Sequence, residues 1–340
     1  MQKREYGIDL LRCVALLFVT GVHSFLYNGF YYEKQIGFLM WGANSARWMF
    51  YCCNCLFMML TGYLKGGKPL SKGYYRSLVP ILMGYVLTCV ISFPIRHFCL
   101  GEKLTLYQWL EKLVTFANYG WYVEMYIGLF LLSPLLNILL EKMQTLKQYL
   151  WLLGTMLILT ALPSLTTANI APDYWTSLYP LTLYILGAGI RRFRPNIPAW
   201  LSALLALATV GLLGLISLLS TDKAFSDGFT QGYGAFWVTL TGTFVFLAVY
   251  RLEVPGKLAP AVSWLAGGCF EGFLLSRLFD VWVYSAAPAS WRQPERYWLC
   301  FVAITIPIFL VSLLAGKAVH ALAVKLTDLI LPKKKAQAVK

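Results

Sequence analysis

The chain has 340 residues, of which 59% are hydrophobic and 13% are charged, and its formal net charge is +14. This is far more apolar than a soluble domain of that length, so the composition excludes a soluble globular protein and indicates a multi-pass membrane protein. The positive charge does not indicate a nucleic-acid partner, because it lies in short segments between apolar runs, where it would meet anionic lipid headgroups.

Apolar runs of about 20 residues predict ten transmembrane helices in an all-α bundle. In chain order they cover 7–28, 48–64, 78–98, 120–140, 148–168, 175–190, 199–220, 233–251, 260–286 and 298–323. With the N-terminus in the cytoplasm, 18 lysines and arginines lie on the cytoplasmic side and 8 on the opposite side, as the positive-inside rule requires. Both termini are then cytoplasmic, with a transmembrane domain over 1–330 and a basic cytoplasmic tail over 331–340.

The first predicted helix carries two ionisable residues, Arg12 and His23. Eleven positions separate them, so at about 100° per residue they share one face, about 16 Å apart along the axis. Ionisable groups at membrane depth are costly and mark functional pathways. We expect both side chains to face one protein-lined passage. The alternative is that Arg12 extends to the cytoplasmic edge of the membrane and His23 to the outer edge, with no role in a site.

The second predicted span carries a polar stripe on one face. Its members follow helical spacing and are Arg47, Tyr51, Asn54, Met58 and Thr61. Such a stripe either joins helices or lines a substrate site, and Arg47 would lie near the same outer level as His23. The eight cysteines, including the Cys52-Cys53-x-Cys55 cluster, predict no metal site, because neighbouring helical positions point in different directions.

The fourth span opens with Trp121-Tyr122-Val123-Glu124, which places a carboxylate in an apolar run. A buried carboxylate must pair with a cation or become protonated. Because Glu124 lies near the outer end of its helix, we expect it to reach His23 or Arg47.

The ninth span concentrates charge at Glu271, Arg277 and Asp280. Arg277 and Asp280 are spaced i, i+3 and can pair on their own helix. Glu271 has no such local partner, so it is the better candidate to face a cavity and balance one of the cations of the first helix. His97 and His320 lie near span ends and are expected to be structural.

Five short motifs, taken in order, are similar to those of one family. They are Arg12-x10-His23, Phe57-Met58-Met59-Leu60-Thr61-Gly62-Tyr63, Lys72-x-x-x-Arg76, Trp121-Tyr122-Val123-Glu124 and Tyr184-Ile185-Leu186-Gly187-Ala188-Gly189. Together they resemble the acyltransferase family 3 of bacterial integral membrane proteins, and the resemblance covers nearly the whole chain. It implies transfer of an acyl group, commonly acetyl from acetyl-CoA, to a hydroxyl or amine of a cell-surface glycan or small molecule. It also implies a catalytic role for His23 and donor binding by Arg12, Lys72 and Arg76.

The residues themselves are compatible with this chemistry. Neutral His23 would act as a general base, oriented by Glu124 or Glu271, and Arg47, Asn54 and Trp121 are candidate substrate contacts. The expected partners are the lipid bilayer of the inner membrane, acyl-CoA and the acceptor, with neither a metal nor nucleic acid, and homodimer formation stays open. The competing class is a transporter of an amino acid or sugar that uses the same polar cavity.

Overall fold

The computed structural model describes residues 4–115, 121–165, 171–219, 232–288, 291 and 294–331. Within those ranges the regular elements are all helices, which confirms the predicted all-α class. Of the predicted basic tail over 331–340, Leu331 alone belongs to the described residues.

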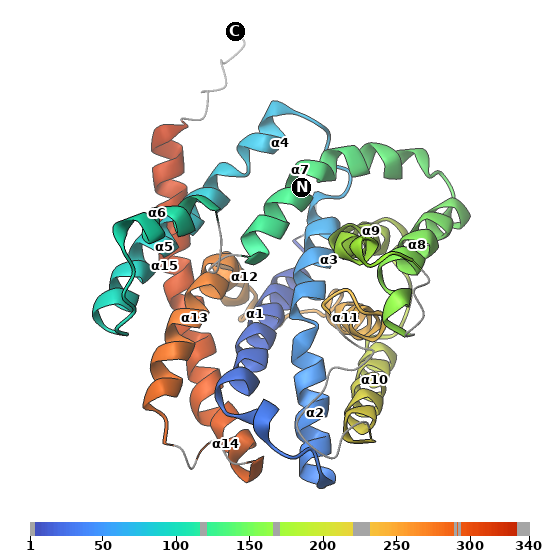
Figure 1. The fold of residues 1–340 in the computed structure, drawn as a ribbon. Coiled ribbons are helices and arrows are strands. Elements are labelled where there is room, and N and C mark those ends of the chain that lie inside the picture. Colours follow the sequence, from blue (N-terminus) through green and yellow to red (C-terminus); the bar gives the residue numbers. More distant parts are fainter. Residues whose placement is uncertain are drawn as a thin grey trace.

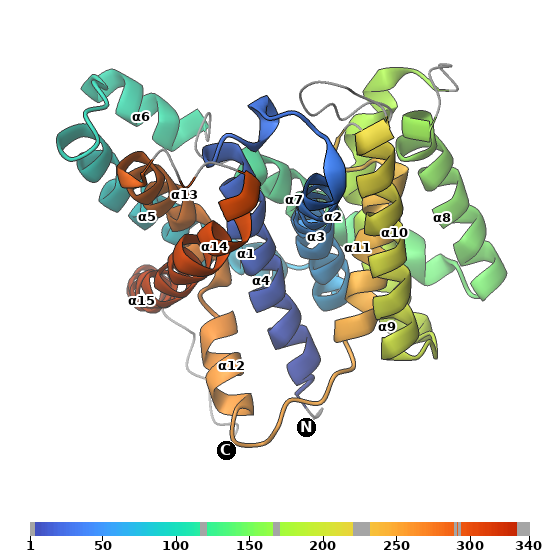
Figure 2. The same ribbon diagram turned by 90° about the horizontal axis from the view of Figure 1, so that it is seen from below.

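Helix α1 (Tyr6–Tyr27) confirms the first predicted span and runs through the middle of the assembly (Figure 1, Figure 2). It packs most extensively against α2 (Gly37–Tyr51), α3 (Cys53–Lys65), α12 (Ala259–Ala266) and α13 (Cys269–Ala286). A helix with protein on several sides can hold ionisable groups at membrane depth, which explains why this one tolerates an arginine and a histidine.

Two predicted spans each consist of two consecutive helices. The span over 48–64 is divided at Cys52, where α2 ends and α3 begins. The span over 260–286 is divided at Gly267 and Gly268, between α12 and α13. An interruption of one or two residues leaves an apolar run unbroken, so hydropathy predicted a continuous helix in both places.

Five helical stretches of the described chain are long and apolar enough to cross a membrane: Tyr6–Tyr27, Lys72–Phe98, Trp121–Lys142, Ala199–Leu219 and Tyr297–Ile330. By contrast, α8 (Leu146–Thr160), α9 (Tyr179–Phe193) and α11 (Phe236–Val249) have 15, 15 and 14 residues. At about 1.5 Å per residue they are roughly 21 to 23 Å long, short of a bilayer core of about 30 Å. The protein is therefore multi-pass, while the count of ten spans and the side of the termini stay predictions.

The remaining elements complete these stretches. The second stretch contains α4 (Lys72–Arg76) and α5 (Val79–Phe98), the third is α7 (Trp121–Lys142) and the fourth is α10 (Ala199–Leu219). The fifth joins α14 (Tyr297–Cys300), a π-turn and α15 (Ile306–Ile330). Helix α6 (Leu106–Thr115) lies beside α5 at the edge of the assembly (Figure 2).

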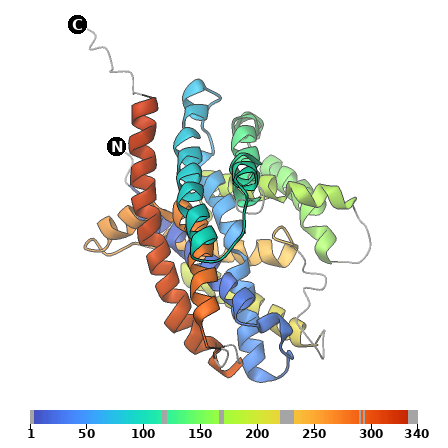
Figure 3. The same ribbon diagram turned by 60° about the vertical axis from the view of Figure 1, so that its left-hand side comes forward.

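Helices α13 and α15 cross with their backbones in contact, and Figure 3 shows α15 running the length of the molecule beside α13. A Cβ atom at Gly272 would lie 2.8 Å from the carbonyl oxygen of Ser312, and one at Gly316 would overlap the backbone of Gly272. Glycine at these positions therefore permits the close approach. The crossing brings the first turn of α13 next to the middle of α15.

The N-terminal end of α1 is tied to neighbouring helices through Glu5. Its carboxylate accepts a hydrogen bond from the Tyr63 hydroxyl at 2.8 Å and pairs with the Arg194 guanidinium at 2.7 Å. Tyr63 belongs to α3 and Arg194 follows α9, so these contacts fix the depth at which Arg12 lies.

Candidate active site

His23 of α1 is paired with Asp280 of α13. Its Nδ1 lies 2.6 Å from Asp280 Oδ2, and the exposed fractions of the two side chains are 22% and 1%. An ionised carboxylate only accepts hydrogen bonds, so Nδ1 carries the proton and the lone pair of neutral His23 is on Nε2. The dyad has the form of a general base held by a buried carboxylate.

The sequence did not predict this partner for His23. It favoured Glu124 or Glu271 as the orienting carboxylate, and it allowed Asp280 a local partner in Arg277. In the structure Glu124 is exposed at the start of α7 and makes no ion pair with another described residue. The prediction that its carboxylate is buried and paired is therefore wrong. The i, i+3 spacing of Arg277 and Asp280 offered a partner within one helix, whereas His23 is 257 residues away from Asp280 in the sequence.

Arg12 lines a cavity of about 490 Å³ between α1, α3, α5, α7, α13 and α15. Its guanidinium, 30% exposed, donates to Asp9 Oδ1 at 3.2 Å, and Asp9 also accepts from Arg4 at 2.8 Å. Lys65 and Lys68 line the same cavity and make it cationic. The cavity has the size of a small-molecule site, which is typically about 300 to 1,000 Å³.

The turn after α3 places the two lysines. Asn137 of α7 is buried and donates to the carbonyl oxygens of Lys65 and Lys68, both at 2.9 Å, while its own oxygen accepts from the Tyr184 hydroxyl at 2.8 Å. Sequence reasoning singled out neither lysine, because both follow the apolar run and look like ordinary loop cations.

Lys72 and Arg76, the basic segment expected to contact the donor, lie on α4 and are exposed. Neither is among the residues that line the cavity, and Arg76 donates to the carbonyl oxygen of Leu331 at the end of α15. Lys65 and Lys68 line the cavity instead, and donor binding by Lys72 and Arg76 stays a prediction. Helix α4 is a separate short helix that is capped by Ser71.

Glu271 lines the Arg12 cavity, as the sequence predicted, and it is buried. Its Oε1 lies 2.9 Å from Nδ1 of His320 on α15, which lines the cavity as well. The sequence predicted only a structural role for His320. A usable signal was its spacing of four residues from Gly316, which puts it on the face of α15 that packs against α13.

The cavity lining includes a cluster of three aromatic rings, Phe57, Tyr122 and Phe273, named the aromatic barrier. The Tyr122 ring centroid lies 5.8 Å from that of Phe57 and 5.1 Å from that of Phe273, and all three residues line the cavity. Beyond this aromatic barrier, Phe57 and Phe273 pack on the apolar cluster of Val19, Val22 and Cys53. His23 is not among the lining residues, so the expected continuous passage from Arg12 to His23 is interrupted in this conformation.

Arg47 and Trp121 belong to one aromatic stack. The Arg47 guanidinium lies 4.1 Å from the Tyr51 ring, Tyr51 stacks on Tyr233 at 4.7 Å, and Tyr233 stacks on Trp121 at 5.1 Å. Cation–π contacts of this kind stabilise a buried guanidinium. Asn54 is buried outside the cavity lining, so the structure does not bring the three predicted substrate contacts into one site.

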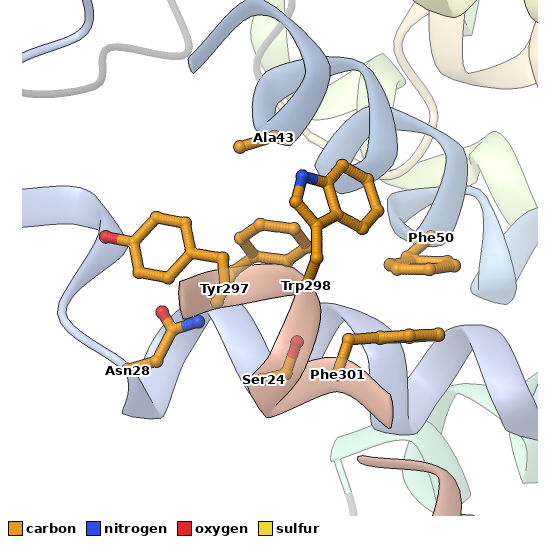
Figure 4. Close-up of a pocket in the computed structure, with 8 residues that line it drawn as sticks. Ser24, Asn28, Ala43, Phe50, Tyr297, Trp298 and Phe301 are labelled. Atoms are coloured by element: carbon orange, nitrogen blue, oxygen red, sulfur yellow. The ribbon is translucent and has the colours of Figure 1, made fainter. Parts of the chain in front are cut away.

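A second, much smaller cavity is lined by Ser24, the residue that follows His23 in the chain. Figure 4 shows it enclosed by Ser24, Asn28, Tyr297, Trp298 and the stacked rings of Phe50 and Phe301. Its volume is about 10 Å³, which is room for about one water molecule. It is too small to receive an acceptor molecule.

The fold and the site define a multi-pass membrane protein in which the central helix α1 carries the histidine of a His–Asp dyad and the arginine of a cationic cavity. A family model described as an acyltransferase domain, Acyl_transf_3, matches residues 5–317. The chain therefore belongs to the acyltransferase family 3, which confirms the resemblance read from its motifs. No curated protein and no solved structure matches the chain.

Proposed function

We propose that the protein transfers an acyl group, in the first instance acetyl, from cytoplasmic acyl-CoA to a hydroxyl or amine of a cell-surface glycan or small molecule. The observation that carries this proposal is the 2.6 Å contact between His23 Nδ1 and Asp280 Oδ2. The family supplies the class of reaction, and the dyad supplies a base at the histidine of the Arg12-x10-His23 motif.

His23 is the general base of the proposed reaction. Asp280 holds the Nδ1 proton, so Nε2 is free to take the proton of the acceptor hydroxyl. The acceptor oxygen bonds to the acyl carbon as the carbon–sulfur bond of the thioester breaks, and the sulfur leaves as a thiol after the His23 imidazolium gives it the proton taken from the acceptor. Asp280 remains ionised and stabilises the imidazolium that forms.

The Arg12 cavity is the proposed donor site. Arg12, Lys65 and Lys68 supply cations for the phosphates of the donor. The aromatic and aliphatic lining suits a thin pantetheine arm, so the thioester would approach the barrier of Phe57, Tyr122 and Phe273 from the cytoplasmic side. For transfer, these rings move apart and the acyl carbon meets the acceptor at His23. The site requires an inner-membrane location with the Lys65 end in the cytosol, where acyl-CoA is available.

Radiolabelled acetyl-CoA and a cell-envelope extract as acceptor source test the proposal on the purified chain in proteoliposomes. We expect label to move from CoA to an envelope component with the wild-type protein, and not with His23→Ala. His97→Gln is the matched control, because His97 lies on α5, bonds to the Glu102 carbonyl and does not line the cavity. Equal labelling by His23→Ala would contradict the proposal.

The transporter alternative gives the opposite result in the same preparation. A transporter would exchange a small polar solute in counterflow without CoA and would leave acetyl-CoA intact. Counterflow with no loss of thioester would replace the acyltransferase proposal.

A further inference from the structure

The pair of Glu271 and His320 is used by no step of the proposed reaction, although it faces the proposed donor cavity. Both residues line the cavity with Arg12. They lie on α13 and α15, whereas the catalytic dyad lies on α1 and α13, so the described part of the chain holds two separate His–carboxylate pairs.

The second pair leaves hydrogen-bonding capacity unused. Glu271 is 2% exposed and its Oε1 bonds to His320 Nδ1, but its Oε2 is buried with no hydrogen-bond partner among the described residues. Arg12, the nearby cation of the cavity, forms its ion pair with Asp9. A buried carboxylate oxygen without a donor is costly, and one at a cavity wall is satisfied when a bound molecule brings an N–H group.

The surroundings keep the carboxylate at this wall. Gly84 of α5 faces it, and a Cβ atom there would lie 2.7 Å from Glu271 Oε1. A larger residue at position 84 would push the carboxylate aside, so glycine leaves the space that the pair occupies. His320 is 33% exposed and completes the rim of the same cavity.

The pair matches one chemical group of the donor. With Nδ1 donating to the carboxylate, neutral His320 has its lone pair on Nε2, so Nε2 and the unpaired Glu271 Oε2 are both hydrogen-bond acceptors. A secondary amide offers one N–H donor to such acceptors, and the pantetheine arm contains two secondary amides between the phosphates and the thioester. Arg12, Lys65 and Lys68 suit the phosphates of the donor, whereas the Glu271–His320 pair suits the uncharged arm.

We propose that Glu271 and His320 form the binding site for an amide of the pantetheine arm, with Glu271 Oε2 accepting its N–H. This inference rests on the proposed function, because it assumes that the cavity takes acyl-CoA. The pair positions the thioester and does not react with it.

Direct binding measurements on the full chain in lipid nanodiscs test the inference with two probes. CoA has the pantetheine arm, and adenosine 3′,5′-bisphosphate has two of the three phosphates of CoA without the arm. We expect Glu271→Gln and His320→Gln to weaken CoA binding by about 10-fold to 100-fold, since a hydrogen bond to a charged group is lost. Both variants keep the wild-type affinity for the bisphosphate.

Two further variants complete the design. Lys68→Gln is expected to weaken the binding of both probes, and His97→Gln is expected to change the affinity for neither. His320 is partly exposed, so its variant tests the site even where Glu271→Gln lowers the yield of folded protein. Unchanged CoA binding by the two variants, or an equal loss of affinity for both probes, would overturn the inference. The proposed function is tested separately, and acetyl-CoA turnover by the wild-type protein would uphold it. A wild-type protein that binds no CoA would overturn both.

Discussion

Replacement of Asp280 by asparagine removes the charge that orients His23 and keeps the shape of the side chain. Asp280 is fully buried and bonded to Nδ1 at 2.6 Å. If the asparagine amide turns its NH₂ group towards the ring, Nδ1 must accept, the proton moves to Nε2, and the base loses the lone pair that faces the acceptor. If the oxygen faces the ring, the imidazolium formed during transfer loses its counter-ion.

The expected effect is on turnover and not on donor binding. General-base catalysis is worth about 10² to 10⁴ in rate, or about 2.7 to 5.4 kcal/mol at about 1.36 kcal/mol per tenfold. We expect the kcat of Asp280→Asn to be lower than that of the wild type by a factor within that range. The KM for acetyl-CoA should stay within about threefold of the wild-type value, because neither His23 nor Asp280 lines the Arg12 cavity.

Transfer of label from radiolabelled acetyl-CoA, measured over a range of donor concentrations, gives both constants. Glu141→Gln is the matched control, because Glu141 is an exposed carboxylate at the end of α7. Thermal unfolding of each variant checks that the bundle is intact. A kcat within threefold of the wild-type value, in a folded Asp280→Asn protein, would refute the role of the dyad.

Three other substitutions follow from the structure. Arg12→Gln should raise the KM for acetyl-CoA about 10-fold to 100-fold through loss of a charge-assisted contact, and an unchanged KM would exclude Arg12 from donor binding. Gly62→Ala should lower the free energy of unfolding by about 1 to 3 kcal/mol, because a Cβ atom there would overlap the Tyr184 carbonyl. A Cβ atom at Gly128 would lie in open space, so Gly128→Ala is the control for Gly62→Ala. Equal unfolding midpoints for the two variants would contradict the close packing of α3 and α9. Phe273→Ala should raise acetyl-CoA hydrolysis without acceptor, because the barrier no longer excludes water; acetate release at the wild-type rate would argue against a barrier.

The sequence was sufficient for features that depend on local composition. Apolar runs predicted the helical class and the extent of α1, and the eleven-residue spacing identified Arg12 and His23 as the residues to examine. The same reasoning about acids in apolar runs placed Glu271 correctly at a cavity wall and failed for Glu124, which is exposed at the start of α7.

Features that depend on helix packing were not predictable from one sequence. The partner of His23 lies 257 residues away, and Arg277 offered a nearer explanation for Asp280. Lys65 and Lys68 became cavity residues because Asn137 fixes the turn that carries them. The aromatic barrier combines α3, α7 and α13, whose relative depth no local pattern contains.

CoA affinity and acetyl-CoA turnover of His23→Ala, measured on the same preparation in lipid nanodiscs, test most directly whether donor binding and catalysis occupy opposite sides of the aromatic barrier. We predict that the variant binds CoA with wild-type affinity and transfers no acyl group. Transfer at a rate near that of the wild type, or a loss of CoA affinity in a folded variant, would contradict the account.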